Sequence, residues 1–193
     1  MTSGSFEHLG DQSVYRGYIW EVVVGSFRDP AGEEFTRDIV RSPGAVAVVP
    51  LIREPDGSHS VVLLRQYRAA FAREIVEVPA GMRDVDGEDP EQTARRELIE
   101  ETGYDAGSLR LLHRFYPSTG MTDSVLHVYL ATDLRHVGRQ MHGPEEAHME
   151  VFTVPFADAV AMVVSGEIAD AKSTIGLLLA DRLVRGLDSD VIR

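Results

Sequence analysis

Hydrophobic residues along this chain occur mainly as short runs between turn residues. Runs rich in β-branched, aromatic and aliphatic residues predict strands at 18–24, 35–40, 45–51, 61–67, 74–78, 109–116, 125–131 and 149–154. A Pro-Asp-Gly turn at 55–57 joins two of these runs and predicts a hairpin with buried faces. Helices are predicted at 90–102 and, closing the chain, near 156–165 and 171–185.

The helix at 90–102 carries signals at both ends. Asp89 is placed to cap it, Pro90 occupies the first helical position, and Gln92 completes a capping-box pattern. Gly103 follows in the position where helices commonly end. Strands interrupted by one central helix and followed by terminal helices predict a mixed sheet covered by helices, in an α/β or α+β layered fold.

Composition narrows the functional classes. The 193 residues include 31 acidic and 19 basic ones, a formal net charge of −12, which argues against a nucleic-acid-binding protein. Cysteine is absent, which excludes disulfides, cysteine-ligated metals and thiol nucleophiles. The first residues show no basic patch followed by an apolar run, and no apolar stretch is long enough to cross a membrane. We therefore expect a cytoplasmic protein without a membrane or nucleic-acid partner.

Half of the net charge lies in residues 84–101, which we call the acidic segment. It contains eight carboxylates and two arginines. On a helix, Glu97 and Glu101 lie about 40° apart and Glu100 about 60° to the other side of Glu97, so the three share one face. Stacked like charges destabilise a helix unless something offsets them, and a divalent cation such as Mg²⁺ prefers carboxylate oxygens. The alternative is a solvated acidic face.

The order of residues around the acidic segment favours the metal. Gly81 is followed by Glu88, seven residues, and then Arg96-Glu97-Leu98-Ile99-Glu100-Glu101-Thr102-Gly103-Tyr104. This resembles the Nudix box, G-x5-E-x7-R-E-U-x-E-E-x-G-U, where U is a bulky apolar residue, and from Glu88 onward every specified position matches. Six residues instead of five separate Gly81 from Glu88. That insertion lies in the loop, where it does not rotate the helical carboxylates.

Segments outside the box resemble the ADP-ribose pyrophosphatase subfamily over about residues 14–182. They are Arg37–Leu51, Gln66–Arg68, Glu77–Gly81 and Gly120–Asp123. The resemblance implies a Nudix-type α/β/α sandwich with a mixed sheet over 44–193. It also implies that the β-rich piece at 1–43 is exchanged across a homodimer and helps to build the substrate site.

The resemblance also implies roles for individual residues. The metal would be Mg²⁺, with Mn²⁺ as the alternative, in two or three ions, held by Glu97, Glu101, Glu100 and the carbonyl of Ala80. Arg96 would orient the helical carboxylates. The substrate would be contacted by Arg68, Arg37, Tyr18, Trp20 and Glu77, with Tyr18 and Trp20 on one strand face against adenine. Glu146, with Glu145 as second choice, would activate water. For the lone arginines, the aromatic pair and the loop acids, the alternatives are solvent exposure or ordinary packing.

These roles together imply hydrolysis of the diphosphate bond of ADP-ribose. Water activated by the metal would attack one phosphorus and release AMP and ribose 5-phosphate. Ser124 stands where the subfamily often has an acid, which bears on the identity of the substrate. Two alternatives remain open: another nucleoside-diphosphate sugar or dinucleotide as substrate, and a non-catalytic nucleotide-sensing module.

Overall fold

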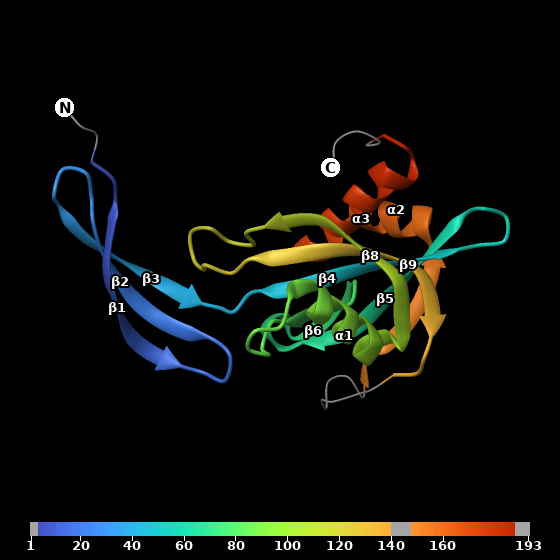
Figure 1. The fold of residues 1–193 in the computed structure, drawn as a ribbon, viewed down its shortest axis with the longest axis horizontal. Helices are drawn as coiled ribbons and strands as arrows, with labels where there is room; N and C mark the ends of the chain where they lie inside the picture. The colour runs from blue at the N-terminus through green and yellow to red at the C-terminus, as the bar shows by residue number, and fades with distance from the viewer. Residues whose placement is uncertain (1–3, 140–147, 188–193) are drawn as a thin grey trace. The chain divides into compact units, whose positions relative to one another are not determined.

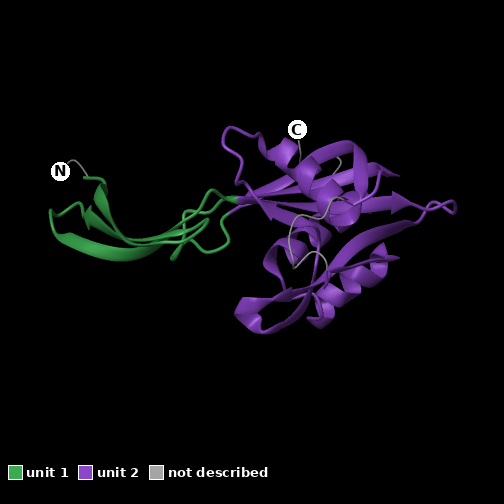
Figure 2. Ribbon diagram, turned by 90° about the horizontal axis from the view of Figure 1, so that it is seen from below, with its two compact units in different colours: residues 1–44, 116–125 green, residues 45–115, 126–193 purple. Residues whose placement is uncertain are grey.

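The computed structural model describes residues 4–139 and 148–187. The chain divides into two compact units, coloured separately in Figure 2. Unit 1 comprises residues 1–44 and 116–125, and unit 2 comprises residues 45–115 and 126–193. The segment 116–125 therefore packs with the N-terminal residues, which its sequence did not indicate. Within the described ranges, no helix has the length and apolar character of a membrane span.

Unit 1 is built on a three-stranded antiparallel sheet. Its strands are β1 (Glu7–Arg16), β2 (Glu21–Arg28) and β3 (Glu34–Arg41), in that spatial order. The segment 116–125 is attached to β3, because the Val40 N–H donates to the Met121 carbonyl at 2.8 Å and the Thr122 hydroxyl donates to the Val40 carbonyl at 2.7 Å. The segment 116–125 thus belongs to the same small β-rich unit as strands β1, β2 and β3.

The N-terminal strands differ from the sequence expectation at two points. Strand β1 was not predicted, since its ten residues are mostly polar and all exposed, and its backbone pairing with β2 holds it in place. The strand predicted at 18–24 begins only at Glu21. Tyr18 and Trp20 lie in the turn between β1 and β2, which the Gly17 N–H closes by donating to the Trp20 carbonyl at 2.8 Å. The prediction that these two aromatic side chains share a strand face was wrong.

Unit 2 contains a mixed sheet, as predicted, and this sheet has seven strands. Its central order is β10-β5-β4-β9-β8, with β6 paired to β5 and β7 to β4. The β4–β9 pair is parallel and the others are antiparallel, including the expected β4–β5 hairpin. The short strand β7 was not predicted. The strands are β4 (Ala45–Arg53), β5 (His59–Arg68), β6 (Arg73–Glu77), β7 (Ala80–Met82), β8 (Tyr104–Phe115), β9 (Leu126–His136) and β10 (Glu150–Pro155); a short 3₁₀ turn, η1, spans Ala69–Phe71.

Helices cover both faces of this sheet, so the layered α/β/α arrangement is confirmed. Helix α1 (Pro90–Thr102) lies on one face, and α2 (Phe156–Ser165) and α3 (Ala171–Val184) lie on the other (Figure 1). Successive side chains of a strand point to opposite faces, and β4 therefore contributes to two cores. Val48 packs with Leu98 of α1, whereas Val49 packs with Leu177 of α3. Burial on both faces explains the continuous apolar run at 45–51.

Candidate active site

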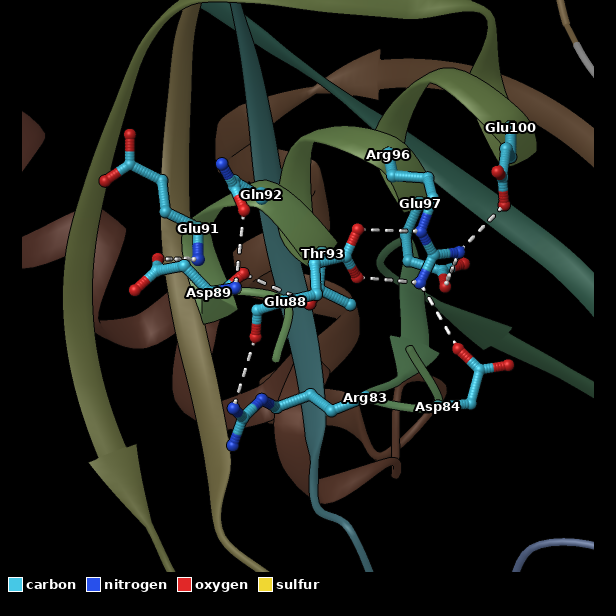
Figure 3. Close-up of polar contacts among 10 residues, drawn as sticks. All are labelled: Arg83, Asp84, Glu88, Asp89, Glu91, Gln92, Thr93, Arg96, Glu97 and Glu100. Atoms are coloured by element: carbon cyan, nitrogen blue, oxygen red, sulfur yellow. Dashed lines mark hydrogen bonds and ion pairs between the residues drawn. The ribbon is translucent and has the colours of Figure 1, made fainter. Parts of the chain in front are cut away.

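Helix α1 carries four of the eight carboxylates of the acidic segment, Glu91, Glu97, Glu100 and Glu101. The Asp89 side chain accepts a hydrogen bond from the Glu91 N–H at 2.9 Å, and the Gln92 side chain accepts one from the Asp89 N–H at 3.4 Å (Figure 3). At the other end, Gly103 adopts the left-handed conformation, with φ of 76°, that lets the chain leave the helix. The predicted bounds and caps are confirmed. Because the helix begins and ends at these residues, the direction in which each of its glutamates points around the helix axis is fixed.

Arg96 gathers carboxylates from the helix and from the loop before it. Its Nη1 contacts Glu97 at 2.7 Å and Glu100 at 3.2 Å, while its Nη2 contacts Glu88 at 3.2 Å and Asp84 at 3.4 Å (Figure 3). Burial alone would lower the pKa of Arg96, but the hydrogen bond to Glu88 and the negative charges of Glu97 and Glu100 raise it further than burial lowers it. This arginine is therefore placed to orient the surrounding carboxylates, the role that the sequence predicts for it.

Where α1 faces strand β7, Glu101 is buried and Glu97 is partly buried. The Ala80 N–H donates to Glu101 Oε2 at 2.8 Å. A Cβ added to Gly81 would lie 1.9 Å from Glu97 Cδ, so any larger residue here would displace this carboxylate from its present position. Burial raises the pKa of Glu97 to about 7 and that of Glu101 to about 8, and the charge of Glu97 adds to the shift at Glu101. For these two carboxyl groups one turn apart, the effect of burial on the pKa thus exceeds that of the positive charges nearby.

The chemistry of these donors fits a hard divalent cation. Carboxylate and carbonyl oxygens are the ligands that Mg²⁺ prefers, and a cation would stabilise the ionised forms that burial disfavours. Among residues 4–139 and 148–187, however, no three His, Asp or Glu side chains converge as a metal-binding group. The reason is visible in the contacts: Arg96 draws the carboxylates of Glu97 and Glu100, whereas Glu101 turns to the Ala80 N–H.

A second cluster of charges lies beside these carboxylates. Arg68 makes two hydrogen bonds to Glu77, of 2.8 and 2.7 Å, and Lys172 Nζ contacts the same carboxylate as well as Asp170 at 2.9 Å. Burial would raise the pKa of Glu77, but the Arg68 hydrogen bonds and the Lys172 charge keep it below its usual value. The positive charges of Arg68 and Lys172 also act on Glu101, where they oppose the rise of its pKa.

Lys172 was not singled out from the sequence, although a signal exists. It is the only lysine among the 19 basic residues of the chain. Its neighbour Ser173 was also missed; the Ser173 hydroxyl accepts the Val78 N–H at 2.9 Å and donates to Asp170 at 2.6 Å. The first turn of α3 therefore holds the segment that leads from β6 to Ala80.

The remaining predicted residues lie elsewhere. In unit 1, the Arg37 guanidinium sits 4.8 Å from the centre of the Phe35 ring and lines a cavity of about 620 Å³. Tyr18 is fully exposed and Trp20 is 55% exposed, and both line a smaller hollow of about 330 Å³ at the β1–β2 turn. Glu145 and Glu146 lie outside the described residues. Unit 2 thus brings together the acidic segment, Ala80, Arg68 and Glu77.

Comparisons with known proteins show the family to which the chain belongs. The NUDIX domain model matches residues 42–174. The chain is 36% identical to the ADP-ribose pyrophosphatase of Mycobacterium tuberculosis over 186 residues, covering 96% of this chain and 88% of that protein. It is also 36% identical to the ADP-ribose pyrophosphatase of Bacillus subtilis over 169 residues, covering 88% and 89%. The crystal structure of an ADP compounds hydrolase superposes with a TM-score of 0.81 at 20% identity, covering 97% and 98%, which shows a shared fold.

Proposed function

Because this chain belongs to the NUDIX domain family and is a pyrophosphohydrolase of nucleoside diphosphates, we propose that it hydrolyses ADP-ribose to AMP and ribose 5-phosphate. The observation that carries the proposal is the pair of carboxylates, partly buried Glu97 and buried Glu101, facing the Ala80–Gly81 segment. The two ADP-ribose pyrophosphatases that match most of the chain support this choice of substrate.

The metal in this proposal is Mg²⁺, in two or three ions, with Mn²⁺ as the alternative. Glu97, Glu101, Glu100 and the Ala80 carbonyl would hold it. When bound, such an ion neutralises the phosphoryl oxygens and lowers the pKa of water. Arg96 contacts Glu97 and Glu100 in the structure, and its task is to hold these carboxylates on the metal side of α1.

The remaining residues have roles in substrate binding and in the activation of water. Arg68 binds the phosphates, and Glu77 acts through Arg68, since Glu77 is only 2% exposed. Arg37, Tyr18 and Trp20 contact the adenosine part of the substrate. Glu146, with Glu145 as second choice, serves as the base that takes a proton from the attacking water. We also propose that the enzyme is cytoplasmic. These assignments rest on the motif positions described above.

We further propose that the protein is a homodimer formed through unit 1. Several large apolar side chains are exposed there: Phe6, Val14, Tyr15, Tyr18 and Trp20. Strand β1 is also an edge of the unit 1 sheet, and exposed edges with apolar side chains favour association. Sedimentation equilibrium tests this: a mass of two chains is expected, and a monomer over the whole concentration range contradicts it.

The test of function is hydrolysis of a panel of nucleoside-diphosphate compounds with Mg²⁺, Mn²⁺ or EDTA, followed through a coupled phosphatase. We expect ADP-ribose to be hydrolysed fastest and EDTA to abolish turnover. Glu101→Gln should remove activity, whereas Glu91→Gln, on the exposed first turn of the same helix, should keep it. Preference for another sugar nucleotide or dinucleotide contradicts the substrate assignment. Binding of ADP-ribose without turnover contradicts catalysis and favours a sensor.

A further inference from the structure

Lys172 is chemically singular in this protein. All the other residues counted as lysine or arginine in the sequence are arginines, so Lys172 carries its only ε-amino group. It is the second residue of α3, and its side chain is only 12% exposed. A lysine ammonium is a compact charge with three donors, whereas a guanidinium is a planar fork. The position therefore calls for a small cation that reaches two carboxylates at once.

The two carboxylates that Lys172 contacts have different surroundings. Asp170 caps α3, because its Oδ2 accepts the Ser173 N–H at 2.9 Å and the Ser173 hydroxyl at 2.6 Å. The positive end of the helix dipole already compensates a carboxylate in that position. Glu77, by contrast, is almost fully buried, and its Oε2 accepts from both Lys172 and Arg68. The principal task of the Lys172 charge is therefore at Glu77.

Because Glu77 is shared with Lys172, it compensates less of the positive charge of Arg68. A carboxylate and a guanidinium joined by two hydrogen bonds form a nearly neutral pair. The Lys172 ammonium takes up part of the Glu77 charge, so that Arg68 retains more of its own. Only two of the five N–H donors of Arg68 are used by Glu77. The Arg68 side chain is 39% exposed and lines a cavity of about 690 Å³ in unit 2, together with Lys172.

We propose that Lys172 is a positioning residue for the diphosphate substrate: by sharing Glu77 it holds Arg68 in place and leaves it charged toward the cavity. The proposal rests on the proposed function at one point, the contact of Arg68 with the substrate phosphates. A purely structural role would be to neutralise buried Glu77, with no consequence for substrate affinity. The two roles differ in kinetics, since the first affects KM and the second affects only stability.

The experiment compares kcat and KM of the full chain and its variants. It uses whichever compound of the panel the unmodified protein hydrolyses fastest, with Mg²⁺. Lys172→Met should raise KM about tenfold and change kcat by less than about twofold. The lost interaction would bind the substrate and the transition state equally well, so its loss weakens binding without slowing the chemical step. Lys172→Arg keeps the charge but not the compact ammonium, so its KM should lie between those of the unmodified protein and Lys172→Met. Arg185→Met is the matched control: it removes an exposed cation from the end of the same helix and should leave KM unchanged.

A second comparison tests whether Lys172 acts through Glu77. Glu77→Gln and the double variant Glu77→Gln/Lys172→Met should have KM values within about twofold of each other, because the shared carboxylate is absent from both. This comparison does not need the single Lys172→Met variant to fold. An unchanged KM in Lys172→Met, a fall in kcat alone, or a difference above about fivefold in the second comparison overturns the proposal. If another compound replaces ADP-ribose as the preferred substrate, the proposed function fails and this test still applies.

Discussion

Replacing Glu101 by Gln should make the metal-free protein more stable at alkaline pH while abolishing its activity. Glu101 is 6% exposed and lies one helical turn from Glu97. The Gln side chain has nearly the same shape, and its carbonyl can accept the Ala80 N–H as the carboxylate does now. The substitution therefore removes a buried charge and keeps the hydrogen bond.

The magnitude follows from the pKa of Glu101, which burial raises from 4.5 to about 8. Between these values the folded protein keeps a proton that the unfolded chain releases, so the free energy of unfolding falls as pH rises through this interval. At about 1.4 kcal/mol for each pKa unit, the ionisation of Glu101 costs about 4 kcal/mol at pH 8 and almost nothing below pH 4.5. The Glu101→Gln variant has no carboxyl group at this position, so its free energy of unfolding does not fall in this way.

Urea unfolding in EDTA at pH 5 and pH 8 measures the effect. At pH 5 the two proteins should agree within about 1 kcal/mol, and at pH 8 the Glu101→Gln variant should be more stable by about 4 kcal/mol. Glu88→Gln provides a control of opposite sign, because the Arg96 hydrogen bond holds the pKa of Glu88 below its usual value and its loss should destabilise the protein at pH 8. Added Mg²⁺ should stabilise the unmodified protein and not the Glu101→Gln variant.

A Glu101→Gln variant that is less stable than the unmodified protein at pH 8 in EDTA would refute this reasoning. It would mean that the ionised carboxylate is already compensated by Arg68, Lys172 and the Ala80 N–H. Equal stability at both pH values would mean that Glu101 has the same pKa in the folded and unfolded states. Either result removes the electrostatic argument that this position needs a cation.

Three further substitutions test separate features of α1. Gly81→Ala should lower kcat/KM about a hundredfold, because its Cβ displaces the flexible Glu97 carboxylate, while the free energy of unfolding changes by less than about 1 kcal/mol. Asp89→Ala removes the cap and should cost about 1 kcal/mol in urea unfolding, with the helix otherwise retained. Leu98→Ala empties a fully buried position between α1 and the sheet and should cost about 3 kcal/mol; a loss below about 1 kcal/mol would contradict the packing.

Where signals lie close together in the chain, the sequence was sufficient. The cap at Asp89 and the stop at Gly103 depend on neighbouring residues, so α1 could be predicted with its bounds. Helical periodicity then places Glu97, Glu100 and Glu101 on one face without any tertiary information. The buried strand at 45–51 and its hairpin partner followed in the same way from an apolar run and a turn.

Elements held by backbone pairing without an apolar pattern, and contacts between distant segments, could not be predicted. Strand β1 is polar and exposed, and only its backbone pairing with β2 makes it a strand. Tyr18 and Trp20, placed in a strand by their β propensity, lie in the turn that the Gly17 N–H closes by donating to the Trp20 carbonyl. The attachment of 116–125 to β3 depends on hydrogen bonds between residues about 80 positions apart, which leave no local pattern.

In the candidate site, too, some features could be predicted from the sequence and others depended on the tertiary structure. Its carboxylates and their spacing were determined by the sequence, because they belong to one helix and one loop. The tertiary structure alone decided what surrounds them: Gly81 against Glu97, Ala80 against Glu101, and Lys172 against Glu77, 95 residues away along the chain. Burial and opposing charge are properties of three-dimensional neighbours. The sequence therefore determined which acids are present, and the fold determined how strongly each one holds its proton.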